Sequence, residues 1–231
     1  YHYLTRAFGR WMGFLFGWAQ LAVILTGSIA LMGYAFADYA LKIRWFGHEL
    51  DPSWTCWLAT VSIVGLTVLN LLGVLFGKVV QNLLSLLKVI GLIGIVVAGL
   101  AFSSNGSFQS AGAPVDSSIG LALVFVLLAF GGWNDAAFVA ADVRNQQRNL
   151  PRALFLGVGL ITGIYLLVVF AYMAVLGFEG ARQTFTPATD VMTKVMGPVG
   201  GTVISLLVMI SALGAINGLI LTGSRIYASL G

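Results

Sequence analysis

Cysteine and charge are both scarce in this sequence. Cys56 is the single cysteine, which excludes an internal disulfide framework and a cysteine-based metal site. Only 9% of the 231 residues are charged, whereas 59% are hydrophobic. A soluble domain carries about 25% charged residues. The composition therefore indicates an integral membrane protein.

Motifs of catalysis and of metal binding are missing as well. The two histidines, His2 and His48, fall in expected loops, and neither an HExxH nor a GxSxG pattern occurs. The 12 basic residues are scattered between apolar stretches, whereas a nucleic-acid surface gathers them in one patch. We therefore expect no enzyme, no cofactor, no metal site and no nucleic-acid partner.

Six apolar stretches are each long enough to cross a bilayer, whose hydrocarbon core is about 30 Å thick. They cover residues 11–39, 54–77, 79–102, 119–141, 151–178 and 199–223. Their sustained length favours helices over barrel strands, which alternate in segments of about ten residues. The sequence thus predicts one all-α, multi-pass transmembrane domain over residues 1–231, surrounded by lipid.

Basic residues in the connections predict the orientation of these helices. One side collects Arg6, Arg10, Lys78, Arg144, Arg148, Arg152 and Arg225, and the other Lys42, Arg44, Arg182 and Lys194. The side richer in Lys and Arg faces the cytoplasm. Both ends of this segment and the connection at 144–152 are therefore expected at the cytoplasmic side of a cell membrane.

One apolar stretch is interrupted near its middle by a glycine pair and two polar residues. The interruption reads Phe130, Gly131, Gly132, Trp133, Asn134 and Asp135. Glycine costs about 1 kcal/mol relative to alanine inside a helix, and polar side chains are expensive at membrane depth. A broken helix is tolerated there only where it faces protein or a water-lined cavity. Secondary transporters hold their substrates at such breaks, so the sequence predicts a ligand site at 130–135.

The members of this break have different expected uses. Gly131 and Gly132 let a ligand approach the main chain because they lack side chains. Phe130 and Trp133 are either ordinary lipid-facing or core aromatics, or the wall and gate of a pocket. Asp135 either caps the second half of the broken helix or contacts an amine of the substrate.

Lys88 lies near the centre of the third apolar stretch. An ammonium group at that depth costs about 2.5–3.5 kcal/mol on insertion scales. It either pairs inside the helix bundle and fixes the packing, or supplies a built-in cation or proton carrier at a transport site. Its depth resembles that of Asp135, which is compatible with an ion pair between the two.

Small and isolated polar residues in the other stretches have expected structural roles. Gly9, Gly13 and Gly17 repeat every four residues, which predicts a close-packed helix face. The lone polar residues Asn70, Ser211 and Asn217 are expected to form hydrogen bonds between helices rather than to contact a ligand.

Two boundaries are also expected. Residues 186–196 predict a short helix on the outer surface, ended by Gly197 and Pro198. Pro151 suits the first turn of the fifth transmembrane helix.

Several stretches together resemble the amino acid–polyamine–organocation superfamily, most closely the L-type amino acid transporters. They are residues 127–139 around the glycine pair, 144–151, 3–9, 80–88 and 217–225. The resemblance implies a fold of two inverted five-helix repeats, with substrate held between broken helices one and six. The six helices would be the third to the eighth of about twelve, so the first, the second and all after the eighth would lie outside this segment.

The resemblance also implies roles for single residues. The main chain of the break would bind the amino end of a substrate. Lys88 would replace the sodium ion of sodium-coupled relatives, with Ser211 as a partner on the eighth helix. Leu128 stands where several relatives carry a gating aromatic, so the gate candidates are Leu128, Phe130 and Trp133.

Relatives that pair with a single-span heavy chain do so through a cysteine in the outer loop before the fourth helix. The loop at 42–53 has none, and Cys56 already lies within the following apolar stretch. The resemblance therefore implies that a disulfide-linked heavy chain is absent.

These inferences combine into secondary transport of amino acids by alternating access, as sodium-independent exchange or proton-linked uptake. A polyamine or cationic amino acid carrier of the same fold is an alternative, because Asp135 is an acid within the break. A non-transporting membrane sensor or assembly subunit is an alternative of another class. An intramembrane hydrolase is disfavoured, since Asp135 is the only acid well inside an apolar stretch.

Overall fold

The computed structural model describes residues 2–43, 50–101, 118–136, 140, 143–184 and 186–230, and all regular elements in these ranges are helical. Within these ranges, five helices are long and apolar enough to cross a membrane: Arg10–Leu41, Pro52–Leu71, Leu75–Ala101, Gln146–Gln183 and Pro198–Arg225. The all-α class is thereby confirmed. The chain forms two compact units, one of Tyr1–Gly91 with Thr202–Gly231 and the other of Leu92–Gly201. Each is described separately.

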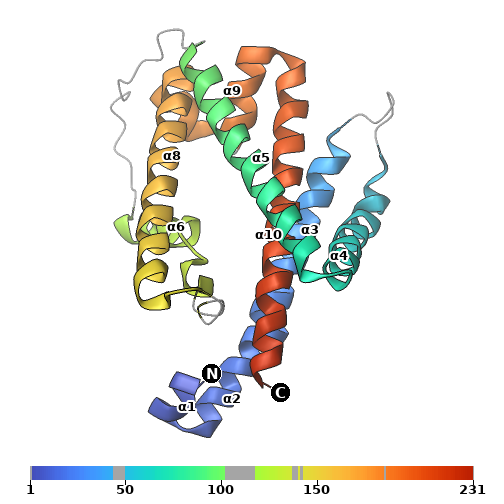
Figure 1. Cartoon of the computed structure of the whole chain (residues 1–231). Helices are drawn as coiled ribbons and strands as arrows, with labels where there is room; N and C mark the ends of the chain where they lie inside the picture. Colours follow the sequence, from blue (N-terminus) through green and yellow to red (C-terminus); the bar gives the residue numbers. More distant parts are fainter. Residues whose placement is uncertain are drawn as a thin grey trace. The chain divides into compact units, whose positions relative to one another are not determined.

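The first unit begins with a short helix that folds back on a long one. Helix α1 (His2–Phe8) precedes α2 (Arg10–Ala19), a π-helical stretch η1 (Gln20–Leu25) and α3 (Thr26–Leu41), which run on as one continuous helix (Figure 1). Gly9 separates α1 from α2 with φ +87°, a conformation that suits glycine. Gly13 lies against Thr5, and Gly17 is buried. The predicted close packing is therefore present at Gly13 and Gly17, whereas Gly9 is exposed outside helix α2 and is not part of that helix face, which corrects the prediction.

The turn between α4 and α5 lies earlier than the sequence predicted. Helix α4 (Thr55–Leu71) follows a short 3₁₀ helix, η2 (Pro52–Trp54), and α5 covers Val74–Ala101. Gly73, with φ +148°, makes the turn. The expected end of the second stretch at residue 77 is wrong, because this glycine takes a conformation that side chains rarely adopt. Lys78 consequently lies in the second turn of α5.

Helix α10 (Pro198–Leu230) completes the first unit from residue 202 onward. Helices α3 and α4 lie side by side, and Ile63 packs over Gly33. A small apolar core joins α10 to the end of α3 through Ala40, Ile43 and Met209, with Phe36, Tyr39 and Leu58 packed around it. Small residues at such contacts let membrane helices approach closely.

The second unit holds the interrupted stretch. Helix α6 (Ile119–Ala129) has 11 residues and is followed by a single 3₁₀ turn, η3 (Trp133–Asp135). The expected sixth long crossing at 119–141 is therefore not among the five long helices, because the helix stops at the glycine pair. Residues 137–139 and 141–142 lie outside the described part.

Helix α8 (Gln146–Gln183) begins earlier than expected. The carbonyl of Asn145 accepts hydrogen bonds from the N–H groups of Arg148 and Asn149, both at 3.0 Å. Pro151 therefore lies in the second turn rather than the first, which corrects the predicted start. The helix bends at Gly177, with φ +74°, close to the predicted end at residue 178.

The predicted short helix at 186–196 is confirmed as α9 (Pro187–Met196), which ends at Gly197 with φ +64°. Its Lys194 ammonium group donates to the carbonyl of Val175, 3.5 Å away and two residues before the bend in α8. Basic groups commonly satisfy carbonyls left free at a helix end. The location of α9 on the outer membrane surface stays a prediction.

Candidate functional site

The break in the second unit is a sharp change of backbone conformation. Helix α6 closes with hydrogen bonds from the Phe130 N–H to Val126 O (3.0 Å) and from the Gly131 N–H to Leu128 O (3.2 Å). Gly132 then turns with φ +88°, and its carbonyl accepts from the N–H of Asp135 at 3.1 Å. The predicted interruption of the helix at the glycine pair is confirmed.

Both glycines are required by this geometry. A Cβ at Gly131 would lie 3.2 Å from the carbonyl oxygen of Leu128, which is tighter than ordinary contacts. At Gly132 the space is open, but the positive φ strains any other residue. The main chain is therefore bare at 131–132, as a ligand-contacting break requires.

The two aromatic residues of the break have different surroundings. Phe130 is half-buried and meets Tyr165 of α8 edge to face, with ring centroids 5.6 Å apart at 68°. Trp133 is 65% exposed and lines an apolar cavity of about 460 Å³. The rest of that lining comes from the start of α8: Leu150, Pro151, Leu154, Phe155 and Val158. Phe130 is thus packed against α8, whereas most of the Trp133 side chain is exposed.

The remaining residues of the break stay predictions as site residues. Asn134 and Asp135 both lie in η3, and Asp135 is half-buried. Leu128 is 70% exposed in the last turn of α6. Its exposed position leaves it a gate candidate beside Trp133.

Lys88 and Ser211 both belong to the first unit, on α5 and α10, and both are half-buried. Asp135 belongs to the second unit. The structure therefore places Lys88 and Ser211 within one unit, while the ion pair between Lys88 and Asp135 stays a prediction.

Helices α5 and α10 run antiparallel and meet every seven residues. A Cβ at Gly77 would lie 3.2 Å from Leu221 Cδ2, and a Cβ at Gly214 would lie 3.3 Å from Leu84 Cβ. At the next step a Cβ at Gly91 would lie 3.1 Å from Leu207 Cδ1. This spacing is that of helices packed as in a coiled coil.

The same register brings Lys88 level with Ile210, the residue before Ser211. Gln81 is hydrogen-bonded to Asn217. Seven residues further along α5 is Lys88, and seven residues back along α10 is Ile210, the neighbour of Ser211. The proximity expected for Lys88 and Ser211 from the resemblance is therefore consistent with the packing of these two helices.

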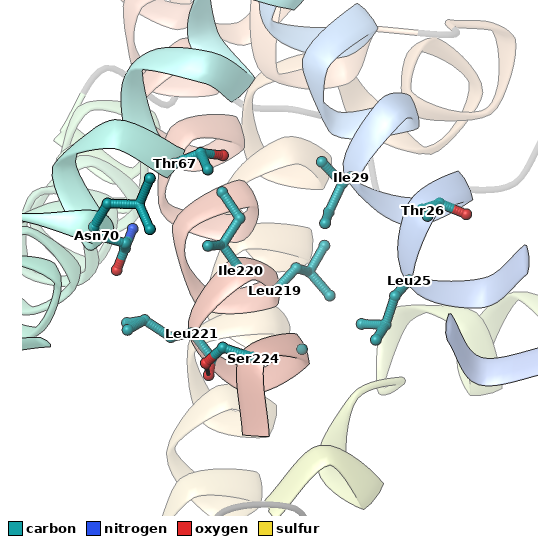
Figure 2. Close-up of a pocket in the computed structure, with 11 residues that line it drawn as sticks. Leu25, Thr26, Ile29, Thr67, Asn70, Leu219, Ile220, Leu221 and Ser224 are labelled. Carbon is teal, nitrogen blue, oxygen red and sulfur yellow. Dashed lines mark hydrogen bonds between the residues drawn. The ribbon is translucent and has the colours of Figure 1, made fainter. Parts of the chain in front are cut away.

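A second cavity, of about 450 Å³, lies in the first unit between η1, α3, α4 and α10. Figure 2 shows Leu219, Ile220 and Leu221 of α10 between Thr67 and Asn70 of α4 and Leu25 and Ile29 of the long N-terminal helix. Its lining carries hydroxyl and amide groups but no charged side chain. An amino acid zwitterion brings two charges, whose burial requires partners. We therefore do not assign this cavity to the amino acid substrate that the resemblance implies.

The sequence predicted only some of the polar contacts between α4, α5 and α10. Asn70 and Asn217 were expected to form hydrogen bonds between helices, and the Asn70 Nδ2 donates to Asn217 Oδ1 at 2.7 Å, which confirms this. Gln81, which joins them, was not singled out as a polar contact. The partners are more than 130 residues apart in the chain, so no local pattern could pair them.

The long apolar helices and the break in α6 together define a class of protein. Helices of membrane length, with an apolar helix that stops at a bare main-chain turn, are typical of a multi-pass membrane transport protein. Residues 1–231 match the amino acid permease family, and the chain belongs to that family.

Relatives from a mammal and from a bacterium are similar along nearly the whole chain. The b(0,+)-type amino acid transporter 1 of Mus musculus is 32% identical over 98% of this chain and 47% of its own length. The serine/threonine exchanger SteT of Bacillus subtilis is 28% identical over 98% of this chain and 51% of its own length. The large neutral amino acids transporter small subunit 2 of Mus musculus is 26% identical, over 98% and 44%.

These relatives bear on two predictions. The match confirms the predicted membership of the amino acid–polyamine–organocation superfamily. Because the relatives are transporters, the expectation that the chain belongs to no enzyme class is also confirmed. The chain spans about half the length of these relatives.

Proposed function

We propose that the intact protein exchanges neutral amino acids across the membrane without sodium. The observation that carries this proposal is the helix break at 130–135 in a member of the amino acid permease family. The names of its relatives support the substrate class, and the name of the bacterial relative supports exchange.

The break provides an attractive position for the ammonium group of an amino acid. The last carbonyls of a helix lack partners within the helix and carry partial negative charge. Helix α6 ends at Ala129, and the bare main chain of Gly131 and Gly132 follows. A substrate ammonium group binds these carbonyls, while its side chain extends along Phe130 or Trp133.

Lys88 takes the place of a coupling sodium ion in this proposal. A lysine fixed to α5 supplies one positive charge that does not dissociate with the substrate. The register of α5 and α10 supports a position of its ammonium group beside Ser211. Transport then needs no sodium gradient, which suits exchange of one amino acid for another.

Alternating access follows from differential binding rather than from covalent chemistry. Substrate at the break favours the conformation in which the site is closed to water, and release favours reopening. Trp133 is the strongest gate candidate, because it lies beside the break and is exposed to an apolar cavity.

Uptake by proteoliposomes that contain the intact protein tests this proposal. Labelled leucine or serine should enter only when the vesicles are preloaded with an unlabelled amino acid, and replacing sodium by choline should leave the rate unchanged. Uptake that needs sodium, or that runs equally well into empty vesicles, would contradict exchange without sodium.

A cationic amino acid or polyamine carrier is the second candidate, because Asp135 lies in the turn of the break. Competition of leucine uptake by arginine and by putrescine distinguishes it. A non-transporting sensor would bind amino acids with no flux, so binding without uptake would favour that class.

We also propose that no heavy chain is linked to this protein by a disulfide. A band that migrates equally on non-reducing and reducing gels would support this.

A further inference from the structure

Asn217 of α10 is completely buried and uses its whole side-chain amide in hydrogen bonds to two other helices. Its Oδ1 accepts from Asn70 Nδ2 of α4 at 2.7 Å. Its Nδ2 donates to the carbonyl of Gly77 at 3.1 Å and to Gln81 Oε1 at 2.9 Å, both on α5. We call Asn70, Gly77, Gln81 and Asn217 the amide hub.

The amide hub leaves no space for a larger residue at Gly77. A Cβ there would collide with Asn70 Oδ1 and lie 3.1 Å from Asn70 Cγ. This oxygen is buried and accepts no hydrogen bond from the described residues. A methyl group added at Gly77 would therefore press against this buried oxygen. The glycine is needed for close approach.

A polar face of α5 connects the amide hub to Lys88. Gln81 Nε2 donates to Ser85 Oγ at 3.5 Å. Gln81, Ser85 and Lys88 are spaced by four and three residues, which places them on one side of the helix. Lys88 therefore lies about two turns beyond the hub on the face that meets α10.

We propose that Asn217 is a positioning residue, which locks the register of α10 against α5 so that Lys88 lies level with Ser211. A slip of one turn would break the hydrogen bonds from the buried Asn217 amide to Gly77 and Gln81 of α5. Partly satisfied buried networks are strongly unfavourable. A single buried asparagine sets register in coiled coils for the same reason.

This inference rests on the proposed function only for the role of Lys88. The register itself is a property of the helices and is measured without transport. Failure of the proposed function would leave the register test intact, and failure of the register test would leave amino acid exchange intact.

Cysteine cross-linking measures the register directly. Leu84→Cys with Gly214→Cys, in a background without other cysteines, brings two Cβ atoms close to the separation of a disulfide. We expect rapid cross-linking with the hub intact and a rate about tenfold lower after Asn217→Leu, because the hydrogen bonds of Asn70 and Gln81 to Asn217 are lost. Thr222→Val is the control on the same helix, since Thr222 Oγ1 bonds only its own helix, at Gly218 O.

A second pair of variants keeps the test decisive if Asn217→Leu does not fold. Gly77→Ala intrudes on the hub while Asn217 remains, and should also slow the cross-link. Gly65→Ala on α4 is its match, because a Cβ there meets no atom within 4 Å. Equal cross-linking in Gly77→Ala and Gly65→Ala would overturn the assignment.

Transport separates positioning from general stability. If Asn217 acts through Lys88, Asn217→Leu lowers exchange in the parent but adds no further loss to Lys88→Ala, measured per folded molecule. Independent effects would add instead. Additive losses, or a cross-linking rate that Asn217→Leu leaves unchanged, would overturn the proposal.

Discussion

Trp133 and Lys88 are the two side chains on which the transport proposal depends most. Trp133→Ala removes the exposed aromatic beside the break, and Lys88→Ala removes the fixed charge. Each should lower the rate of exchange by about tenfold or more, which corresponds to about 1.4 kcal/mol of transition-state stabilisation. The measurement is initial uptake into proteoliposomes, normalised to folded protein.

Matched controls separate these effects from general loss of an aromatic or a charge. Trp57 on α4 is the matched aromatic, since its side chain is 66% exposed and that of Trp133 is 65% exposed. Trp57→Ala should keep most activity because Trp57 lies outside the break. Lys42→Ala is the matched control for Lys88→Ala, because Lys42 lies outside the transmembrane stretches. Its ammonium group lies 4.0 Å from the ring centre of Tyr39. Equal losses in Trp133→Ala and Trp57→Ala would show that the break has no special role.

Asp135 decides between neutral and cationic substrates. If its carboxylate contacts a second substrate ammonium group, Asp135→Asn should lower inhibition by arginine about tenfold or more while leucine uptake is retained, because one charge-assisted contact is lost. If it only caps the 3₁₀ turn, both substrates lose equally. The measurement is the inhibition constant of arginine and of leucine in the same vesicles.

At the scale of the helix, Gly132 fixes the shape of the break. Gly132→Ala forces a side chain into φ +88°, which costs about 1–2 kcal/mol. We expect lower thermal stability together with slower exchange. Gly157→Ala on α8 has ordinary φ and open space, and should be neutral or stabilising by up to about 1 kcal/mol. Thermal unfolding of both variants in detergent checks the pair.

Helix positions were largely predictable from the sequence, and helix ends were not. Sustained apolar length located α4, α5, α8 and α10, because a membrane helix must be about 20 apolar residues long. The turn at Gly73 was missed, since a glycine within a continuous apolar run gives no signal of positive φ. The start of α8 was missed because Asn145 begins it in a left-handed conformation.

The candidate site was predictable only in part, because the sequence shows local interruptions of a helix but not contacts between distant helices. The glycine pair at 131–132 interrupts a local pattern, so the sequence alone located the break. The amide hub joins Asn70, Gln81 and Asn217 across more than 130 residues. Such contacts depend on the register of α5 and α10, which is set by packing and leaves no local trace.

At the scale of the whole molecule, orientation in the membrane is open to a direct test. Gln147→Cys is exposed at the start of α8, and Ser53→Cys is exposed before α4. From the distribution of Lys and Arg, and with the exposed Cys56 replaced by serine, a membrane-impermeant thiol reagent should label Ser53→Cys in intact cells and Gln147→Cys only after permeabilisation. Labelling in the reverse order would contradict the predicted orientation.

Because α5 and α10 meet in seven-residue steps, neither helix can slide along the other by a small amount. The nearest arrangement that restores interlocking is a full turn away, about 5.4 Å, and it would break the hydrogen bonds from Asn217 to Gly77 and Gln81. We therefore expect these segments of α5 and α10 to travel as one rigid body, carrying Lys88 and Ser211 together through each cycle.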